Sequence, residues 1–141
     1  MIMYKMTLLI YDTLKQIDKL KVNIRENDST SEVWLKFSVG DGHPYTIRFI
    51  STDDENDVAI RVFSLLTAAP SQRLSILPVI NNLNCRNRYY KFILDANGNI
   101  NLQYDFNTSC PDPAASAKEM IKRVVKIVNE SYPILARALG A

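Results

Sequence analysis

The stretch that most constrains the fold is a β-hairpin predicted over residues 89–106 and closed by the run Asp95-Ala96-Asn97-Gly98. Two registers compete for it. A two-residue turn at Asn97-Gly98 sets strongly apolar residues opposite polar ones. A three-residue loop with Gly98 in the left-handed region instead gathers the apolar residues of both strands on one face. Its pairs are Leu94 with Ile100, Phe92 with Leu102 and Tyr90 with Tyr104. We predict this register, because the buried face sets strand pairing.

The bulk properties of the chain predict a single domain over residues 1–141. Of its 141 residues, 47% are hydrophobic and 23% are charged, and the net charge is +2. No window reaches the roughly 18 apolar residues of a membrane span. The apolar residues 6–11 run straight into charged helical sequence, without the cleavage site of a signal peptide. We therefore expect a cytoplasmic protein with no membrane contact. Cys85 and Cys110 show no metal spacing, and in a protein without an export signal we expect them to be free thiols.

Periodicity predicts the flanking helices and the strands between them. A first helix is predicted over residues 4–20, and a last, long helix begins at Pro113 with Asp112 as its N-cap. Pro133 is expected to kink or end that helix. Alternation of apolar and polar residues predicts strands over residues 33–39, 45–50 and 58–63, and a weaker pattern suggests a short strand over residues 21–25.

A further helix is predicted after Pro70, with an inward stripe of Leu74, Leu77, Ile80 and Leu83. Pro78 conflicts with a regular helix, because proline has no amide to donate to the residue four positions earlier. Two alternatives stay open: a kink at Pro78, or an irregular lead-in over residues 70–77. The order helix, strands, helix, two strands, helix predicts an α+β domain with an antiparallel sheet of five to six strands.

The second helix and the hairpin also carry a family-like motif. It consists of Leu77-Pro78-Val79-Ile80-Asn81-Asn82-Leu83-Asn84, then Arg86, Arg88, Tyr89, Lys91, Phe92, Leu94, Asp95 and Gly98, with Tyr132-Pro133 near the end of the chain. This motif resembles the YbjN-domain family, whose fold is like that of the type III secretion chaperones. The resemblance implies an α+β domain without catalytic apparatus. Members are described as bacterial regulators of sensory transduction, and the related chaperones bind extended protein segments as dimers.

His43 is the first of two candidates for chemistry. It is the only histidine and lies between Gly42 and Pro44. A nucleophile–base pair would require His43 beside Cys85, Cys110 or a serine, with a third group to orient it. We expect a solvated turn residue instead.

The second candidate is an acidic run of Asp53, Asp54, Glu55 and Asp57. As a calcium loop starting at Asp53 it would have Val58 where glycine is needed and Ser64 where glutamate is needed. We interpret the run as a charged hairpin turn. The sequence therefore predicts no enzyme, no metal and no cofactor.

The polar face of the predicted sheet is the strongest candidate for binding. Alternation points basic and aromatic residues outward along it: Trp34, Lys36, Arg48, Arg61, Phe63, Tyr89 and Lys91, with Arg86 and Arg88 at the margin. Large aromatics and arginine are enriched at binding hot spots. We predict that the partner-binding residues are Trp34, Arg48, Arg61, Tyr89 and Lys91. The alternative is that a helix covers this face and makes Trp34 part of the core.

Two function classes follow from this face. The first is a non-enzymatic protein-interaction or chaperone-like regulatory module that binds a protein partner or forms a homodimer. The alternative is a nucleic-acid-binding accessory domain, in which the aromatics stack bases and the cations contact phosphates. Nucleic acid is the weaker prediction, because the net charge is small and Asp105 shares the face.

Overall fold

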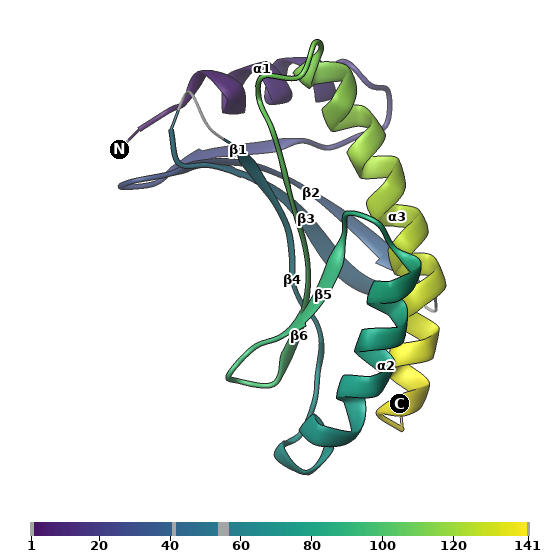
Figure 1. The fold of residues 1–141 in the computed structure, drawn as a ribbon. Coiled ribbons are helices and arrows are strands. Elements are labelled where there is room, and N and C mark those ends of the chain that lie inside the picture. Colours follow the sequence, from purple (N-terminus) through teal and green to yellow (C-terminus); the bar gives the residue numbers. More distant parts are fainter. Residues whose placement is uncertain (1, 41, 54–56, 141) are drawn as a thin grey trace.

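The chain forms one six-stranded antiparallel sheet and three α-helices, as expected for the α+β class (Figure 1). The computed structural model describes residues 2–40, 42–53 and 57–140. The elements are α1 (Lys5–Leu14), β1 (Asn23–Glu26), β2 (Ser31–Val39), β3 (His43–Ser51), β4 (Val58–Thr67), the 3₁₀ turn η1 (Pro70–Gln72), α2 (Arg73–Arg86), β5 (Lys91–Leu94), β6 (Asn99–Phe106) and α3 (Pro113–Ala138). The strand order is β1-β2-β3-β4-β6-β5, which makes β1 and β5 the edge strands.

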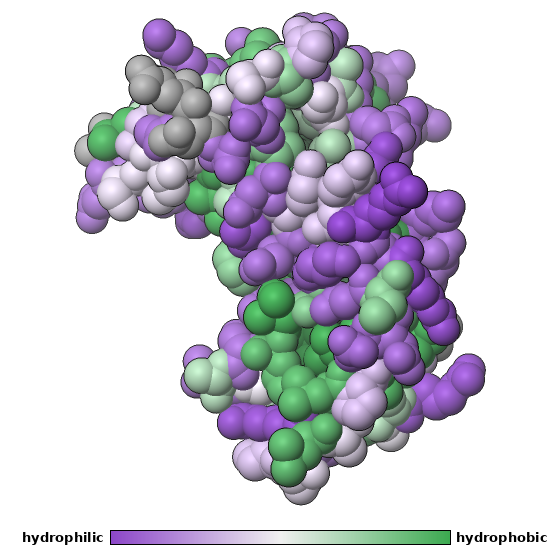
Figure 2. Space-filling model, viewed as in Figure 1, coloured by the Kyte–Doolittle hydropathy of each residue, from purple (hydrophilic) through white to green (hydrophobic). Residues whose placement is uncertain are grey.

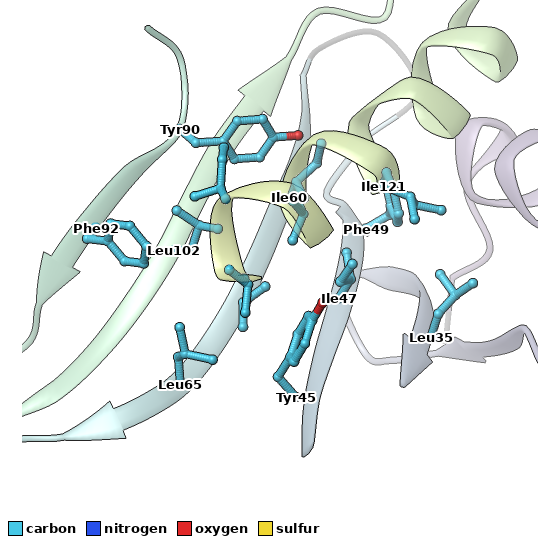
Figure 3. Close-up of a cluster of buried hydrophobic side chains, with 14 of the residues drawn as sticks. Leu35, Tyr45, Ile47, Phe49, Ile60, Leu65, Tyr90, Phe92, Leu102 and Ile121 are labelled. Atoms are coloured by element: carbon cyan, nitrogen blue, oxygen red, sulfur yellow. The ribbon is translucent and has the colours of Figure 1, made fainter. Parts of the chain in front are cut away.

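All three helices pack against the same face of the sheet. Thr7 of α1 hydrogen-bonds to Ser31 on the core side of β2, with 2.7 Å between the two hydroxyl oxygens. Ile121 of α3 belongs to the same buried cluster as the strand residues Phe49 and Ile60 (Figure 3). In Figure 1 the helices lie along the upper and right sides of the curved sheet, and the side facing left carries no helix.

The hairpin of β5 and β6 has the predicted register. Leu94 pairs with Ile100 and Phe92 pairs with Leu102. Gly98 lies in the left-handed region with φ +85°, and its amide donates to the Asp95 carbonyl at 3.1 Å. The three-residue loop with a glycine bulge is therefore confirmed, and the short strand expected near residues 21–25 is present as β1.

The first helix is shorter than predicted, since α1 ends at Leu14 and not at residue 20. The amides of Gln16 and Ile17 donate to carbonyls only three residues earlier, and Lys19 has a positive φ of 70°. These tight turns carry Ile17 and Leu20 back against the core, where both are partly buried. Both residues thus reach the core although the helix does not continue to them.

Both prolines lie inside helices that continue past them. The irregular lead-in is limited to η1, and α2 then runs through Pro78 to Arg86, while α3 runs through Pro133 to Ala138. Of the two outcomes expected at Pro133, a kink or an end of the helix, the end is wrong, because α3 continues to Ala138. The carbonyls that lose an amide partner belong to Leu74 and Asn129, which are exposed, so water can satisfy them.

The inward stripe predicted for α2 is confirmed at Ile80 and Leu83 but is wrong at Leu74 and Leu77. The buried residues are Ile76, Ile80 and Leu83, whereas Leu74 is 84% exposed and Leu77 is 45% exposed. Ile76 lies one helical turn before Ile80 and therefore shares its face. In contrast, Asp112 caps α3 as predicted and accepts from the Ala115 amide at 3.0 Å. Within the described residues, no helix combines the length and the apolar character needed to cross a membrane.

Candidate functional site: the open sheet face

The strand register aligns most of the predicted binding residues in one row across the sheet. We call this row, made of Trp34, Arg48, Arg61, Gln103 and Lys91, the central row. Each residue of the row is the register partner of the next. Trp34 pairs with Arg48 and Arg48 pairs with Arg61. Arg61 then pairs with Gln103, and Gln103 pairs with Lys91. Four of the five predicted residues therefore fall on neighbouring strands at one level of the sheet, and Gln103 is the member that sequence reasoning missed.

Trp34 lies between two arginines on the face that no described helix covers. The guanidinium carbons of Arg25 and Arg48 lie 5.1 Å and 5.7 Å from the centre of its ring. These cation–π contacts leave Trp34 half-buried without a helix over it. The alternative interpretation of Trp34 as a core residue under a helix is not what the structure shows.

The two arginines are held in place by Glu32, which is 4% exposed. Its Oε1 accepts from Nη1 of Arg48 at 2.8 Å and also from Nη2 of Arg25. A carboxylate can be buried in this way only when it is paired. Glu32 thus pairs with both cations that flank Trp34, and the three side chains together keep one net positive charge.

Arg61 is also satisfied within the sheet. Its Nη1 lies 2.7 Å from Oδ1 of Asp105 and donates to the backbone carbonyls of Ile60 at 2.9 Å and Tyr104 at 3.2 Å. The charge of Arg61 is therefore largely compensated by its own neighbours.

Lys91 and Tyr89 lie at the β5 end of the sheet, and neither is a free contact group of the open face. Nζ of Lys91 donates to the Asn84 carbonyl at 2.8 Å and to the Asn87 carbonyl, at the C-terminus of α2. Cations are favourable there because the last helical carbonyls lack amide partners. Tyr89 precedes β5 and packs at a ring-centre distance of 5.6 Å from Tyr104.

Two hollows flank the Trp34 end of the central row. One, of about 320 Å³, is lined by Lys36, Pro44, Tyr45, Thr46, Arg48 and Phe63. The other, of about 210 Å³, is lined by Lys21, Asn23, Trp34 and Lys36. Lys36 borders both, and Phe63 is 50% exposed beside it. Lys21 and Lys36 have no ion pair among the described residues, which makes this end of the face the part with available positive charge.

A second exposed apolar surface lies away from the central row. Leu74 and Leu77 of α2 and Ile93 of β5 are each at least 40% exposed. Figure 2 shows the corresponding hydrophobic area in the lower half of the view, between α2 and the β5–β6 hairpin. This surface is the natural place to test whether the chain associates with itself.

His43 is not the solvated turn residue that the sequence suggested. It begins β3, is partly buried, and its Nε2 donates to the Leu65 carbonyl at 2.9 Å. Its ring stacks on Tyr132 of α3 at 4.6 Å between centres. His43 is partly buried because α3 packs across the start of β3. The local sequence around His43 does not reveal the position of that helix. His43 therefore ties the helix to the sheet.

The cysteines and acidic residues show no assembled chemical site in the described chain. Cys85 is exposed and Cys110 is partly buried, and both are free thiols as expected. Of the acidic run, Asp54 and Glu55 lie outside the described residues. Among residues 2–40, 42–53 and 57–140, no cluster of three or more His, Cys, Asp or Glu side chains could hold a metal ion.

Comparison with known proteins adds no assignment: no family model, no curated protein and no solved structure matches the chain. The resemblance to the YbjN domain therefore stays a prediction.

Proposed function

We propose that this chain is a cytoplasmic, non-enzymatic interaction module of the YbjN type, which binds an acidic, extended segment of a partner protein on its open sheet face. The observation that carries the proposal is the arrangement around Trp34. A half-buried tryptophan is clamped by two arginines on a helix-free sheet face and is flanked by two hollows that share Lys36.

The apolar part of this face favours binding to protein. A side chain of tryptophan size on a sheet face gains a few kcal/mol when it is fully buried. Trp34 is half-buried and Phe63 is 50% exposed, so both retain surface that a partner could cover. Aromatic residues with an adjacent arginine are typical of the residues that dominate binding energy at protein interfaces.

The charge distribution indicates which kind of partner fits. Lys21 and Lys36 line the hollows and have no ion pair in the described chain, so they can receive carboxylates. Arg48 and Arg61 are already paired with Glu32 and Asp105. Few cations on this face therefore remain to neutralise phosphates, which makes nucleic acid the weaker alternative. Because the hollows lie on both sides of Lys36, an extended segment that crosses β2 would contact both.

The test uses Trp34 as its own reporter, since it is the single tryptophan in the chain. A partner captured from native cytosol is identified, its acidic segment is synthesised, and binding is followed by Trp34 fluorescence. Lys36→Glu is expected to weaken binding roughly tenfold or more, because it places a carboxylate in both hollows. Lys122→Glu, an exposed lysine of α3 that lines neither hollow, is the matched control and is expected to bind like the wild type.

Three outcomes would overturn the proposal. Equal binding by the Lys36→Glu and Lys122→Glu variants would remove the open face from the interaction. If the protein sediments as a dimer, if Leu74→Asp abolishes that dimer, and if no partner requires the open face, the function is self-association through α2. Binding of single-stranded oligonucleotides that weakens steeply with salt and requires Lys36 would favour the nucleic-acid alternative.

A further inference from the structure

A separate cleft of about 380 Å³ lies between the connector from α2 to β5 and the middle of α3. The charged side chains and the exposed aromatic ring that line it come from two sides. Arg86, Arg88 and Tyr89 lie on the connector side, and Arg123, Lys126 and Glu130 lie on α3. These six residues bring four cations and one carboxylate to one concave site. A cleft of this size is large enough for a small organic ligand.

Three of the four cations of this cleft have no partner within the described chain, unlike Arg48 and Arg61 of the open face. The exposed side chains of Arg86, Arg88 and Lys126 make no ion pair or hydrogen bond with any described residue. Arg123 has only a loose pair, with its Nε 3.9 Å from Oε1 of Glu119, and both side chains are about half exposed. Three arginines and a lysine, with only Glu130 and the loosely paired Glu119 beside them, repel one another, and an anion placed between them would relieve that repulsion.

The aromatic wall of the cleft is fixed in position. Tyr90 is 2% exposed, and its hydroxyl donates to the Met120 carbonyl at 3.3 Å, which attaches the connector to α3. The Tyr104 ring packs against both tyrosines, with ring centres 5.0 Å from Tyr90 and 5.6 Å from Tyr89. Tyr89 itself remains 52% exposed at the cleft. Its ring can therefore receive a planar group while the cations contact attached phosphates.

We infer that this cleft binds a small phosphate-bearing molecule with a planar ring, that is, a nucleoside phosphate. The phosphates would lie among Arg88, Lys126 and Arg123, and the ring would pack on Tyr89. Arginine and lysine both suit phosphate, and arginine adds paired hydrogen bonds to two phosphate oxygens. This site is distinct from the open face, because none of its lining residues borders the hollows beside Trp34.

The test measures the binding of ATP, inorganic pyrophosphate and adenosine to the full chain by isothermal titration calorimetry. We expect ATP to bind more tightly than pyrophosphate, and adenosine to bind the weakest. Arg88→Ala and Lys126→Ala should each weaken ATP binding roughly tenfold, the effect of losing one charge-assisted contact. Lys122→Ala, one turn earlier on α3 and outside the cleft lining, should leave ATP binding unchanged.

Tyr89 separates the ring contact from the phosphate contact. Tyr89→Ala should weaken ATP binding while leaving pyrophosphate binding unchanged, and Tyr89→Phe should retain both, provided that thermal melts show each variant folded. Lys36→Glu should leave ATP binding intact, so failure of this inference is distinguishable from failure of the proposed function. Equal affinity for ATP and pyrophosphate would overturn the nucleoside assignment. If the Lys122→Ala and Lys126→Ala variants bind ATP with the same affinity, the cleft is not the ATP-binding site.

Discussion

The side chain of Asn84 pairs with the backbone of Phe92 as a neighbouring strand would. Its Oδ1 accepts from the Phe92 amide at 2.7 Å, and its Nδ2 donates to the Phe92 carbonyl at 3.0 Å. β5 is an edge strand, so these two backbone groups face away from β6 and would otherwise lack partners. One amide side chain of α2 thereby closes this edge of the sheet.

Asn84→Ala is expected to lower the free energy of unfolding by about 2 kcal/mol, because it leaves two backbone groups of a buried residue unsatisfied. Urea unfolding measures this change. Asn82→Ala is the matched control, since Asn82 is exposed on the same helix and no described residue bonds to its side chain. Similar stability losses in both variants would mean that the bridge to Phe92 contributes nothing.

Gly98→Ala is expected to destabilise the hairpin by roughly 2 kcal/mol or more. About 1 kcal/mol comes from the left-handed backbone, which disfavours a side chain. The rest comes from a clash, since a Cβ on Gly98 would overlap the Ala68 carbonyl. Gly42→Ala provides the comparison, because Gly42 also has a positive φ, of 97°, but has open space around it. If the two variants unfold at the same urea concentration, the clash is absent.

The hairpin and the class of fold could be predicted from the sequence because their causes are local. Apolar alternation and one glycine were sufficient to choose between two registers of β5 and β6. The same alternation correctly placed Trp34, Arg48 and Arg61 on the face opposite the core. These patterns repeat within a few residues, so no distant contact is needed to interpret them.

The inward residues in the first half of α2 and the partners of the site residues could not be predicted, because they depend on distant contacts. Ile76 is buried because α2 packs beside β5 and α3, whose positions are set by the whole sheet. The pairing of Arg61 with Asp105 requires β4 to lie next to β6, and α2 and β5 separate these strands in the sequence. Alternation gives the side of a residue, but for two strands that no hairpin joins it does not give the neighbour on the next strand.

Tyr45 is expected to make the protein less stable in alkali. Burial raises the pKa of Tyr45 to about 12, above its ordinary value of 10.0. Between these values the unfolded chain loses the proton while the folded chain keeps it, so stability is full below pH 10 and falls as the pH rises toward 12. Urea melts at several alkaline pH values should show this decline, and Tyr45→Phe should reduce its slope.

The Tyr45→Phe variant also tests the stability of the protein at neutral pH. The Tyr45 hydroxyl is buried and has no hydrogen-bond partner among the residues that the structure describes. Its removal in Tyr45→Phe should therefore leave stability unchanged or raise it by about 1 kcal/mol. Tyr90→Phe is the contrasting change, because the Tyr90 hydroxyl donates to the Met120 carbonyl and its loss should destabilise the protein. A larger loss for Tyr45→Phe than for Tyr90→Phe would contradict this account.

The two cysteines should differ in their rate of reaction with a thiol reagent. Cys85 is exposed, whereas Cys110 is partly buried with its Sγ 3.6 Å from Oγ of Ser116. The folded protein should show one fast and one slow reaction, because access limits the attack on Cys110. Cys85→Ser should remove the fast phase only. Loss of the slow phase instead would reverse the assignment, and no reaction after unfolding without reductant would indicate a disulfide.

Glu32 should control both the stability of the sheet and the environment of Trp34. Glu32 is 4% exposed, and its carboxylate pairs with Arg25 and Arg48, whose guanidinium groups lie over the Trp34 ring. Glu32→Gln removes the charge and retains the shape, so the arginines lose their shared anion. We expect a loss of about 1–2 kcal/mol in urea unfolding, less than for a fully buried pair because the arginines reach solvent.

The fluorescence of Trp34 tests the same arrangement independently of stability. Once the arginines are released, the indole gains contact with water, and its emission in the folded Glu32→Gln variant should shift to longer wavelength. Glu26→Gln is the matched control, since Glu26 is exposed on β1 and has no ion pair in the described chain. It should change neither the emission nor the melt. An unchanged emission in Glu32→Gln would show that the sheet alone holds Trp34 in place. Arg25 and Arg48 would then not be what orders the binding face.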